Sequence, residues 1–227
     1  MKRLRFPNDN TLILLNKGGS SLLGWIIKFY SDSKGIPIRH NEEGEGKKVL
    51  VIRNPYQRFI SGFLHQWYGN DREILHDFRM YLSKAVRGEI EVDGVVDYHL
   101  WRAGSIMDRE GIEPDVVIKI EDLEEEMENW GKWNLGAREP DWRVIGEPPF
   151  GTETPKLMKE LELPYEGWDA LFFKGLWLQS KESVKGHHRV ERREFLSTLL
   201  EGDSRTKREL NKWVEGDMFR WGYKRML

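Results

Sequence analysis

The segment VLVIRNPYQRFISGFLHQWY, which begins at Val49, contains a short apolar strand that runs directly into an amphipathic helix. Val49–Ile52 has the length and the β-branched content of a buried parallel strand. Asn54 and Pro55 follow as the polar residue and the proline that commonly start a helix. Arg53 is therefore predicted at the carboxyl end of a parallel strand, where open α/β sheets bind their ligands.

A hydroxyl group in the same segment can join this arginine. Ser61 lies about two turns into the predicted helix, on the side that can face back toward Arg53. A guanidinium and a hydroxyl that converge on one point make a good phosphate site. Taken alone, the segment is equally compatible with a strand–helix turn in which Arg53 only caps its own sheet.

A second strand–loop–helix unit precedes the first one. Thr11–Leu15 is a short apolar strand, and a strongly apolar helix begins near Leu22. Between them lies a glycine- and hydroxyl-rich loop that consists of Asn16, Lys17, Gly18, Gly19, Ser20 and Ser21. Glycines let backbone N–H groups approach an anion, the helix start adds a favourable partial charge, and a lysine adds a point charge. The lysine precedes the glycines, so the loop is not a Walker A motif, in which the lysine follows them.

Alternating strands and helices in the first half predict an α/β fold with a parallel sheet and right-handed crossovers. A short extra strand is expected at Ile36–Ile38. Helices are expected over Glu73–Val86, Tyr98–Arg109, Glu191–Leu200 and Ser204–Arg220. At 227 residues the chain is expected to form a single domain, 1–227, with an irregular insert at about 129–169. That insert is rich in proline and glycine and carries the tryptophans at 130, 133, 142 and 168.

Composition excludes several classes of protein. The formal net charge is −2, so the chain lacks the overall positive charge that is typical of nucleic-acid binding. It has no cysteine, which excludes disulfides and thiolate metal sites. The first residues are too polar for a secretory signal, and no apolar run reaches the ~18 residues of a membrane span. These features favour a cytoplasmic protein.

The two loop motifs together resemble the signature motifs of sulfotransferases that use 3′-phosphoadenosine 5′-phosphosulfate (PAPS). NKGGSS is similar to the first motif of that family, and IRNPYQRFISGF is similar to the second. The spelling R-(D/N)-P-x-x-R-x-x-S-x-F resembles the carbohydrate branch, which includes the Golgi and heparan types. The Golgi relatives are anchored and contain cysteine, so the resemblance implies a soluble version of bacterial or viral type. Looser similarity extends to Asp97-Tyr98-His99, to Val116–Leu123, and to the segment Trp213–Tyr223.

This resemblance implies a P-loop-like sulfotransferase fold, a three-layer sandwich with a central parallel sheet. It implies that the first motif, Lys17 to Ser21, binds the 5′-phosphosulfate of PAPS. Arg53 and Ser61 would bind the 3′-phosphate, and Lys185-Gly186 would form the far wall of the nucleotide site. The implied reaction is in-line transfer of a sulfuryl group from PAPS to an acceptor hydroxyl, without a metal. The acceptor is expected to be a saccharide or another small molecule. The sequence does not indicate an oligomeric state.

Such a transfer needs a general base for the acceptor hydroxyl. His40 is the first candidate, because it lies between the two motifs, where related enzymes carry their base. His99 is the second, because it falls in the stretch similar to a D-x-H element of chondroitin-type enzymes. Glu42 and Glu43 are acidic substitutes near His40.

Two other functions fit parts of the sequence. A P-loop kinase or NTPase would use VVIKIED, from Val116 to Asp122, as a Walker B strand whose acids hold Mg²⁺. The position of Lys17 before the glycines is evidence against a kinase or NTPase. That interpretation also leaves Arg53 and Ser61 without a role. A non-catalytic nucleotide- or glycan-binding module would keep the phosphate-binding residues and lose the base.

Overall fold

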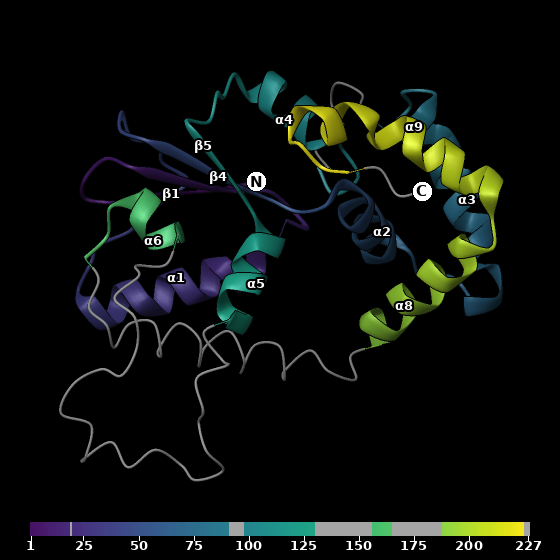
Figure 1. Cartoon of the computed structure of the whole chain (residues 1–227), viewed down its shortest axis with the longest axis horizontal. Coiled ribbons are helices and arrows are strands. Elements are labelled where there is room, and N and C mark those ends of the chain that lie inside the picture. Colours follow the sequence, from purple (N-terminus) through teal and green to yellow (C-terminus); the bar gives the residue numbers. More distant parts are fainter. Residues whose placement is uncertain (19, 91–97, 130–155, 165–187, 225–227) are drawn as a thin grey trace, which may run out of the picture.

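The computed structural model describes residues 1–18, 20–90, 98–129, 156–164 and 188–224. They form a mixed α/β fold around one five-stranded sheet (Figure 1). In chain order the strands are β1 (Lys2–Arg5), β2 (Thr11–Leu14), β3 (Arg39–His40), β4 (Lys48–Ile52) and β5 (Val116–Lys119). Their order across the sheet is β3-β1-β2-β4-β5.

The sheet is mixed rather than entirely parallel. β2, β4 and β5 are parallel to one another, as predicted for the strands that carry the two motifs. β1 is antiparallel to both of its neighbours, β2 and β3. The sequence KRLR of β1 has a single apolar residue, so its strand character comes from pairing with β2 rather than from its own pattern.

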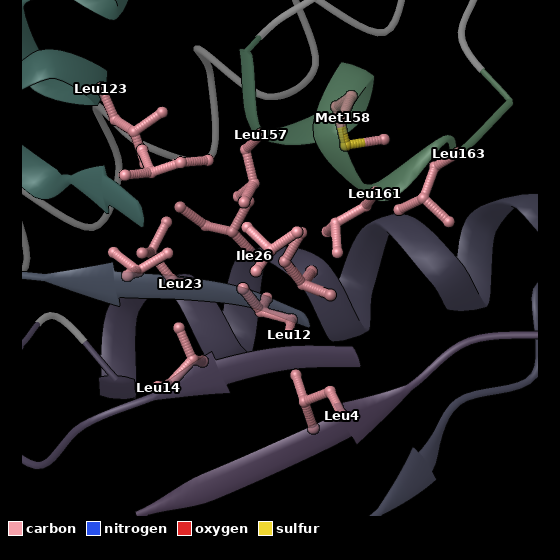
Figure 2. Close-up of a cluster of buried hydrophobic side chains, with 14 of the residues drawn as sticks. Leu4, Leu12, Leu14, Leu23, Ile26, Leu123, Leu157, Met158, Leu161 and Leu163 are labelled. Atoms are coloured by element: carbon pink, nitrogen blue, oxygen red, sulfur yellow. The ribbon is translucent and has the colours of Figure 1, made fainter. Parts of the chain in front are cut away.

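Helices pack on both faces of the sheet. On one face lie α1 (Ser20–Lys34), α5 (Ile120–Asn129) and the short α6 (Lys156–Leu161). Figure 2 shows Leu12 and Leu14 of β2 on this face, near Leu23 and Ile26 of α1. α4 (Ala103–Glu110) covers the opposite face through a separate apolar cluster with the other side of β2 and β4. Because β2 is covered on both faces, all four of its residues are buried, as expected of a central parallel strand.

A group of helices extends from one side of the sheet (Figure 1). It consists of α2 (Pro55–Gln66), α3 (Ile74–Val86), α8 (His188–Glu201) and α9 (Ser204–Arg220), with a 3₁₀ turn, η1 (Asp71–Glu73), before α3. These helices share one apolar cluster, which includes Phe59, Phe63, Phe78 and Leu196. α2 therefore links the sheet, where it begins, to this helical group.

Three expected elements differ from the structure. The strand expected at Ile36–Ile38 lies instead at Arg39–His40. The helix expected from Tyr98 begins at Ala103, because the Asp217 carboxylate of α9 accepts the Ala103 and Gly104 N–H groups at 2.6 and 2.8 Å and caps the helix there.

The third difference lies in the segment expected to be irregular at 129–169. In that segment α6 forms a regular turn whose Leu157, Met158 and Leu161 are buried against α1 (Figure 2). The four tryptophans of the segment lie outside the described residues. Within the described part of the chain, no helix is long and apolar enough to cross a membrane.

Candidate functional site

The candidate site lies at the edge of the sheet where the parallel strands β2, β4 and β5 end. Leu14 of β2 pairs with Val51 of β4, and Ile52 of β4 pairs with Lys119 of β5. The segments that leave these strands therefore start side by side, at the sheet's spacing of about 4.8 Å per strand. Lys17 and Arg53, predicted from separate motifs, both follow directly from this edge.

The loop after β2 turns tightly over the ends of two strands. Lys17 has a φ of +61°, a left-handed conformation that is uncommon for a lysine. The Gly18 N–H donates to the Leu15 carbonyl at 3.0 Å. A Cβ atom at Gly18 would lie 3.1 Å from the Leu15 carbonyl oxygen and 3.5 Å from that of Val51, so a side chain here would require the turn to shift by a few tenths of an ångström.

The loop ends at the amino terminus of α1. Ser20 and Ser21 are the first residues of this helix, so their backbone N–H groups have no acceptor within it. Gly19 lies outside the described residues, and the side chains of the two serines are not described. A lysine, a buried glycine and a helix start in succession form an anion-binding arrangement.

Asn54 anchors the second motif at the end of β4. Its side-chain oxygen accepts the Tyr56 N–H at 3.0 Å and the Gln57 N–H at 3.4 Å, which caps α2. Its own N–H donates to Glu121 Oε1 at 2.8 Å. Glu121 also accepts the Tyr223 hydroxyl at 2.9 Å, so the start of α5 ties the Arg53–Asn54 turn to the last described segment of the chain.

Arg53 is half-buried beside this anchor. Burial and the nearby positive charge of Arg193 lower the pKa of its guanidinium, while the negative charges of Glu121 and Glu124 act in the opposite direction. Among the described residues, the Arg53 guanidinium forms no hydrogen bond or ion pair. A partly desolvated cation whose nearest described carboxylates lie beyond ion-pair distance is suited to binding an anion.

Arg58 joins the two motifs, a role that the sequence analysis did not assign. It is 3% exposed, and its Nε donates to the Asn16 carbonyl at 3.1 Å. Its Nη2 donates to the Tyr98 carbonyl at 2.9 Å, and its Nη1 donates to the Trp101 carbonyl. One guanidinium thus connects α2, the residue before Lys17, and the turn at 98–101. The sequence feature that could have indicated this role is that Arg58 lies on the apolar side of α2, next to Phe59.

We expect Arg58→Met to destabilise the fold by about 3–5 kcal/mol, because three buried or part-buried carbonyls lose charge-assisted hydrogen bonds at once. Chemical denaturation with urea measures this change. Arg205→Met is the matched control, because Arg205 is exposed on α9 and its one ion pair among the described residues is with Glu209. Equal stability of the two variants would contradict the role assigned to Arg58.

The two histidine candidates lie in different places. His40 is exposed on the edge strand β3, opposite Leu4 of β1, which in turn pairs with Leu12 of β2. It is therefore two strands away from β2, on the order of 10 Å across the sheet. His99 lies in the turn whose carbonyls bind Arg58, and its ring stacks on His65 with centroids 4.4 Å apart.

The acidic substitutes near His40 are engaged in ion pairs. Glu42 pairs with Arg5 and Arg39, and Glu43 pairs with Arg3 and Lys48. Of the remaining predicted site residues, Ser61 is half-buried on α2, whereas Lys185 and Gly186 lie outside the described residues. The described part of the chain contains no cluster of three or more metal-ligand residue types.

The geometry thus places two candidate anion sites at neighbouring strand ends, one at the Lys17–Gly18 turn and one at Arg53, and Arg58 connects α2 to the segment that precedes Lys17. Such a pair suits a ligand with two separate anionic groups. A family model described as "Sulfotransferase family" matches residues 19–134, about half of the chain. The match includes Arg53, Arg58 and Ser61. Neither a curated protein nor a solved structure matches the chain.

Proposed function

Because the chain belongs to the sulfotransferase family, we propose that it transfers a sulfuryl group from PAPS to a hydroxyl of a saccharide or related small acceptor. The observation that carries this proposal is the pair of anion sites at neighbouring strand ends. PAPS has two anionic groups at opposite sides of its ribose, a 5′-phosphosulfate and a 3′-phosphate. Lys17 and the loop amides would bind the first, and Arg53 with Ser61 would bind the second.

The reaction forms one bond and breaks another at sulfur. The acceptor oxygen bonds to sulfur while the bond from sulfur to the bridging phosphate oxygen breaks, and adenosine 3′,5′-bisphosphate leaves. The acceptor's proton goes to a general base of the protein. Negative charge develops on the departing bridging oxygen, where a preorganised cation and backbone N–H groups stabilise the transition state. Lys17 and the start of α1 supply these groups.

We rank His99 ahead of His40 as the base. Arg58 donates both to Asn16, which precedes Lys17, and to the two carbonyls that flank His99. The backbone of the His99 turn is therefore held beside the donor loop by one guanidinium, with the His99 ring against His65 of α2, whereas His40 lies two strands from β2. Proximity to the group in transfer is the first requirement for a base.

The proposed fold is the P-loop-like three-layer arrangement. Its support is that α1, α5 and α6 pack on one face of the sheet and α4 packs on the other. The anion-binding loop then lies between β2 and α1, at the carboxyl end of a parallel strand.

Mass-detected transfer from PAPS to an array of oligosaccharides and small alcohols tests the proposed function. We expect one acceptor class to gain a sulfate, with release of adenosine 3′,5′-bisphosphate in equal amount. Release of free sulfate alone, at the same rate with and without acceptors, would contradict transfer to a hydroxyl.

A further inference from the structure

The Glu121 carboxylate lies beside the arginine of the second anion site. Ile52 of β4 pairs with Lys119 of β5 where these two strands end. Asn54 and Glu121 each follow two residues later, so they leave the sheet side by side. Glu121 Oε1 accepts the Asn54 N–H at 2.8 Å, and it therefore contacts the peptide group that joins Asn54 to Arg53.

A carboxylate this close to an arginine would ordinarily form an ion pair with it. Glu121 and Arg53 do not, since the Arg53 guanidinium has no hydrogen-bond or ion-pair partner among the described residues. Such an ion pair would occupy the cation that the second anion site needs. The contacts that keep Glu121 apart from Arg53 therefore bear on whether this site can bind an anion.

The second oxygen of the same carboxylate is engaged by Tyr223. The Tyr223 hydroxyl donates to Oε2 of Glu121 at 2.9 Å. Burial, followed by the negative charge of Glu121, raises the pKa of this hydroxyl, so it stays protonated and acts as the donor. The two hydrogen bonds, one to each oxygen, fix the orientation of the carboxylate beyond ion-pair distance of Arg53.

The position of Tyr223 is determined by the way in which α9 ends. Gly222 has a φ of +61°, and the Tyr223 N–H donates to the Met218 carbonyl at 2.9 Å, an arrangement that commonly terminates a helix at glycine. Lys119 holds the same segment, because its Nζ donates to the Gly222 carbonyl at 2.8 Å and lies 4.6 Å from the centre of the Tyr223 ring. Tyr223 therefore reaches Glu121 from a fixed position.

We propose that the Tyr223 hydroxyl is a positioning group that holds the Glu121 carboxylate away from Arg53 and so keeps the guanidinium available to an anion. This inference rests on the proposed function, in which Arg53 binds the 3′-phosphate of the nucleotide. Without the hydroxyl, Oε2 of Glu121 loses its donor next to a half-buried cation. An ion pair between Glu121 and Arg53 then competes with the phosphate. Tyr223 acts through Glu121 rather than through contact with the nucleotide.

The test compares Tyr223→Phe, Glu121→Gln and the double variant with the wild type. Calorimetry measures their affinities for adenosine 3′,5′-bisphosphate and for AMP, which lacks the 3′-phosphate. We expect Tyr223→Phe to bind the bisphosphate roughly 5- to 30-fold more weakly, because the new ion pair must be broken first. AMP affinity should stay within about 2-fold of the wild type, since AMP has no group for Arg53 to bind.

The double variant separates positioning from a merely structural role. Glutamine at 121 keeps an oxygen for the Asn54 N–H but carries no charge, so it cannot form an ion pair with Arg53. Glu121→Gln alone should therefore bind the bisphosphate at least as tightly as the wild type. Added to Tyr223→Phe, it should restore bisphosphate affinity to within about 3-fold of the wild type. A merely structural role predicts the opposite, because the double variant has lost more native contacts than either single variant.

Tyr98→Phe is the matched control for the loss of a hydroxyl from a carboxylate. The Tyr98 hydroxyl donates to Glu110 at 2.8 Å, and Glu110 already pairs with Arg3 at 2.9 Å. Removal of this hydroxyl therefore releases no carboxylate toward Arg53. The ratio of the two nucleotide affinities should be the same in Tyr98→Phe as in the wild type.

The possible outcomes distinguish the role of Tyr223 from the proposed function. Equal bisphosphate affinity of Tyr223→Phe and the wild type would overturn the role of Tyr223 and leave the proposed function standing. An equal loss for both nucleotides, or a double variant that binds no better than Tyr223→Phe, would also overturn that role. If the wild type binds no bisphosphate at all, the proposed function itself fails, and with it the role of Tyr223.

Discussion

Lys17→Ala is expected to lower kcat by roughly 10²–10³-fold, while the affinity for adenosine 3′,5′-bisphosphate falls much less. The physical reason is that the ammonium group interacts most strongly in the transition state, when negative charge develops on the bridging oxygen of the donor. Alanine is suited to this test because the left-handed conformation at this position costs about as much free energy for alanine as for lysine. The substitution therefore removes the charge without a new backbone cost.

Lys28→Ala is the matched control for this variant. Lys28 is exposed on α1 and pairs with Asp32 four residues later, so its loss should leave kcat within about 2-fold. Single-turnover kinetics with PAPS separates the transfer step from product release. A Lys17→Ala enzyme that keeps its transfer rate but loses nucleotide affinity would show that the lysine only binds the ground state.

His99→Gln is expected to lower kcat by roughly 10²–10⁴-fold, the range for loss of a positioned general base. A base acts in its deprotonated form, so wild-type activity should fall toward acidic pH, and this acidic limb should disappear in the variant. Affinity for the bisphosphate should persist, since the base contacts the acceptor rather than the nucleotide. The measurement is a pH–rate profile of kcat for each variant, with bisphosphate affinity measured in parallel.

Two control variants separate catalysis from packing. His65→Gln removes the ring that stacks on His99, so it reports any effect of that stack on the turn. His40→Gln tests the candidate that the sequence ranked first. If His40→Gln removes the acidic limb and His99→Gln leaves turnover near normal, the roles of the two histidines are reversed.

The elements that carry the candidate site were predictable from local pattern. Thr11–Leu15 and Val49–Ile52 are short apolar runs followed by turn residues, and both are strands that end at the same edge of the sheet. The final helix has the predicted bounds Ser204–Arg220, and in the structure Asp203 caps it by accepting the Thr206 N–H. Lys17 and Arg53 were correctly placed because each follows its strand by only a few residues.

What the sequence did not predict depends on contacts between distant segments. The start of α4 is determined by Asp217, which lies more than a hundred positions later in the chain. The structural role of Arg58 depends on carbonyls at 16, 98 and 101, and local periodicity gives no information about these. The identity of the acceptor and the cytoplasmic location stay predictions from the sequence.

The central claim is that the chain binds a nucleotide through two separate anion sites, one of which is specific for the 3′-phosphate. Calorimetry with adenosine 3′,5′-bisphosphate in the presence of EDTA tests this claim most directly, with Arg53→Ala beside the wild type. We expect the wild type to bind without added metal, and Arg53→Ala to bind roughly 10- to 100-fold more weakly with AMP affinity nearly unchanged. Strictly Mg²⁺-dependent binding of ATP, with no binding of the bisphosphate, would contradict the claim and favour a phosphoryl-transfer enzyme.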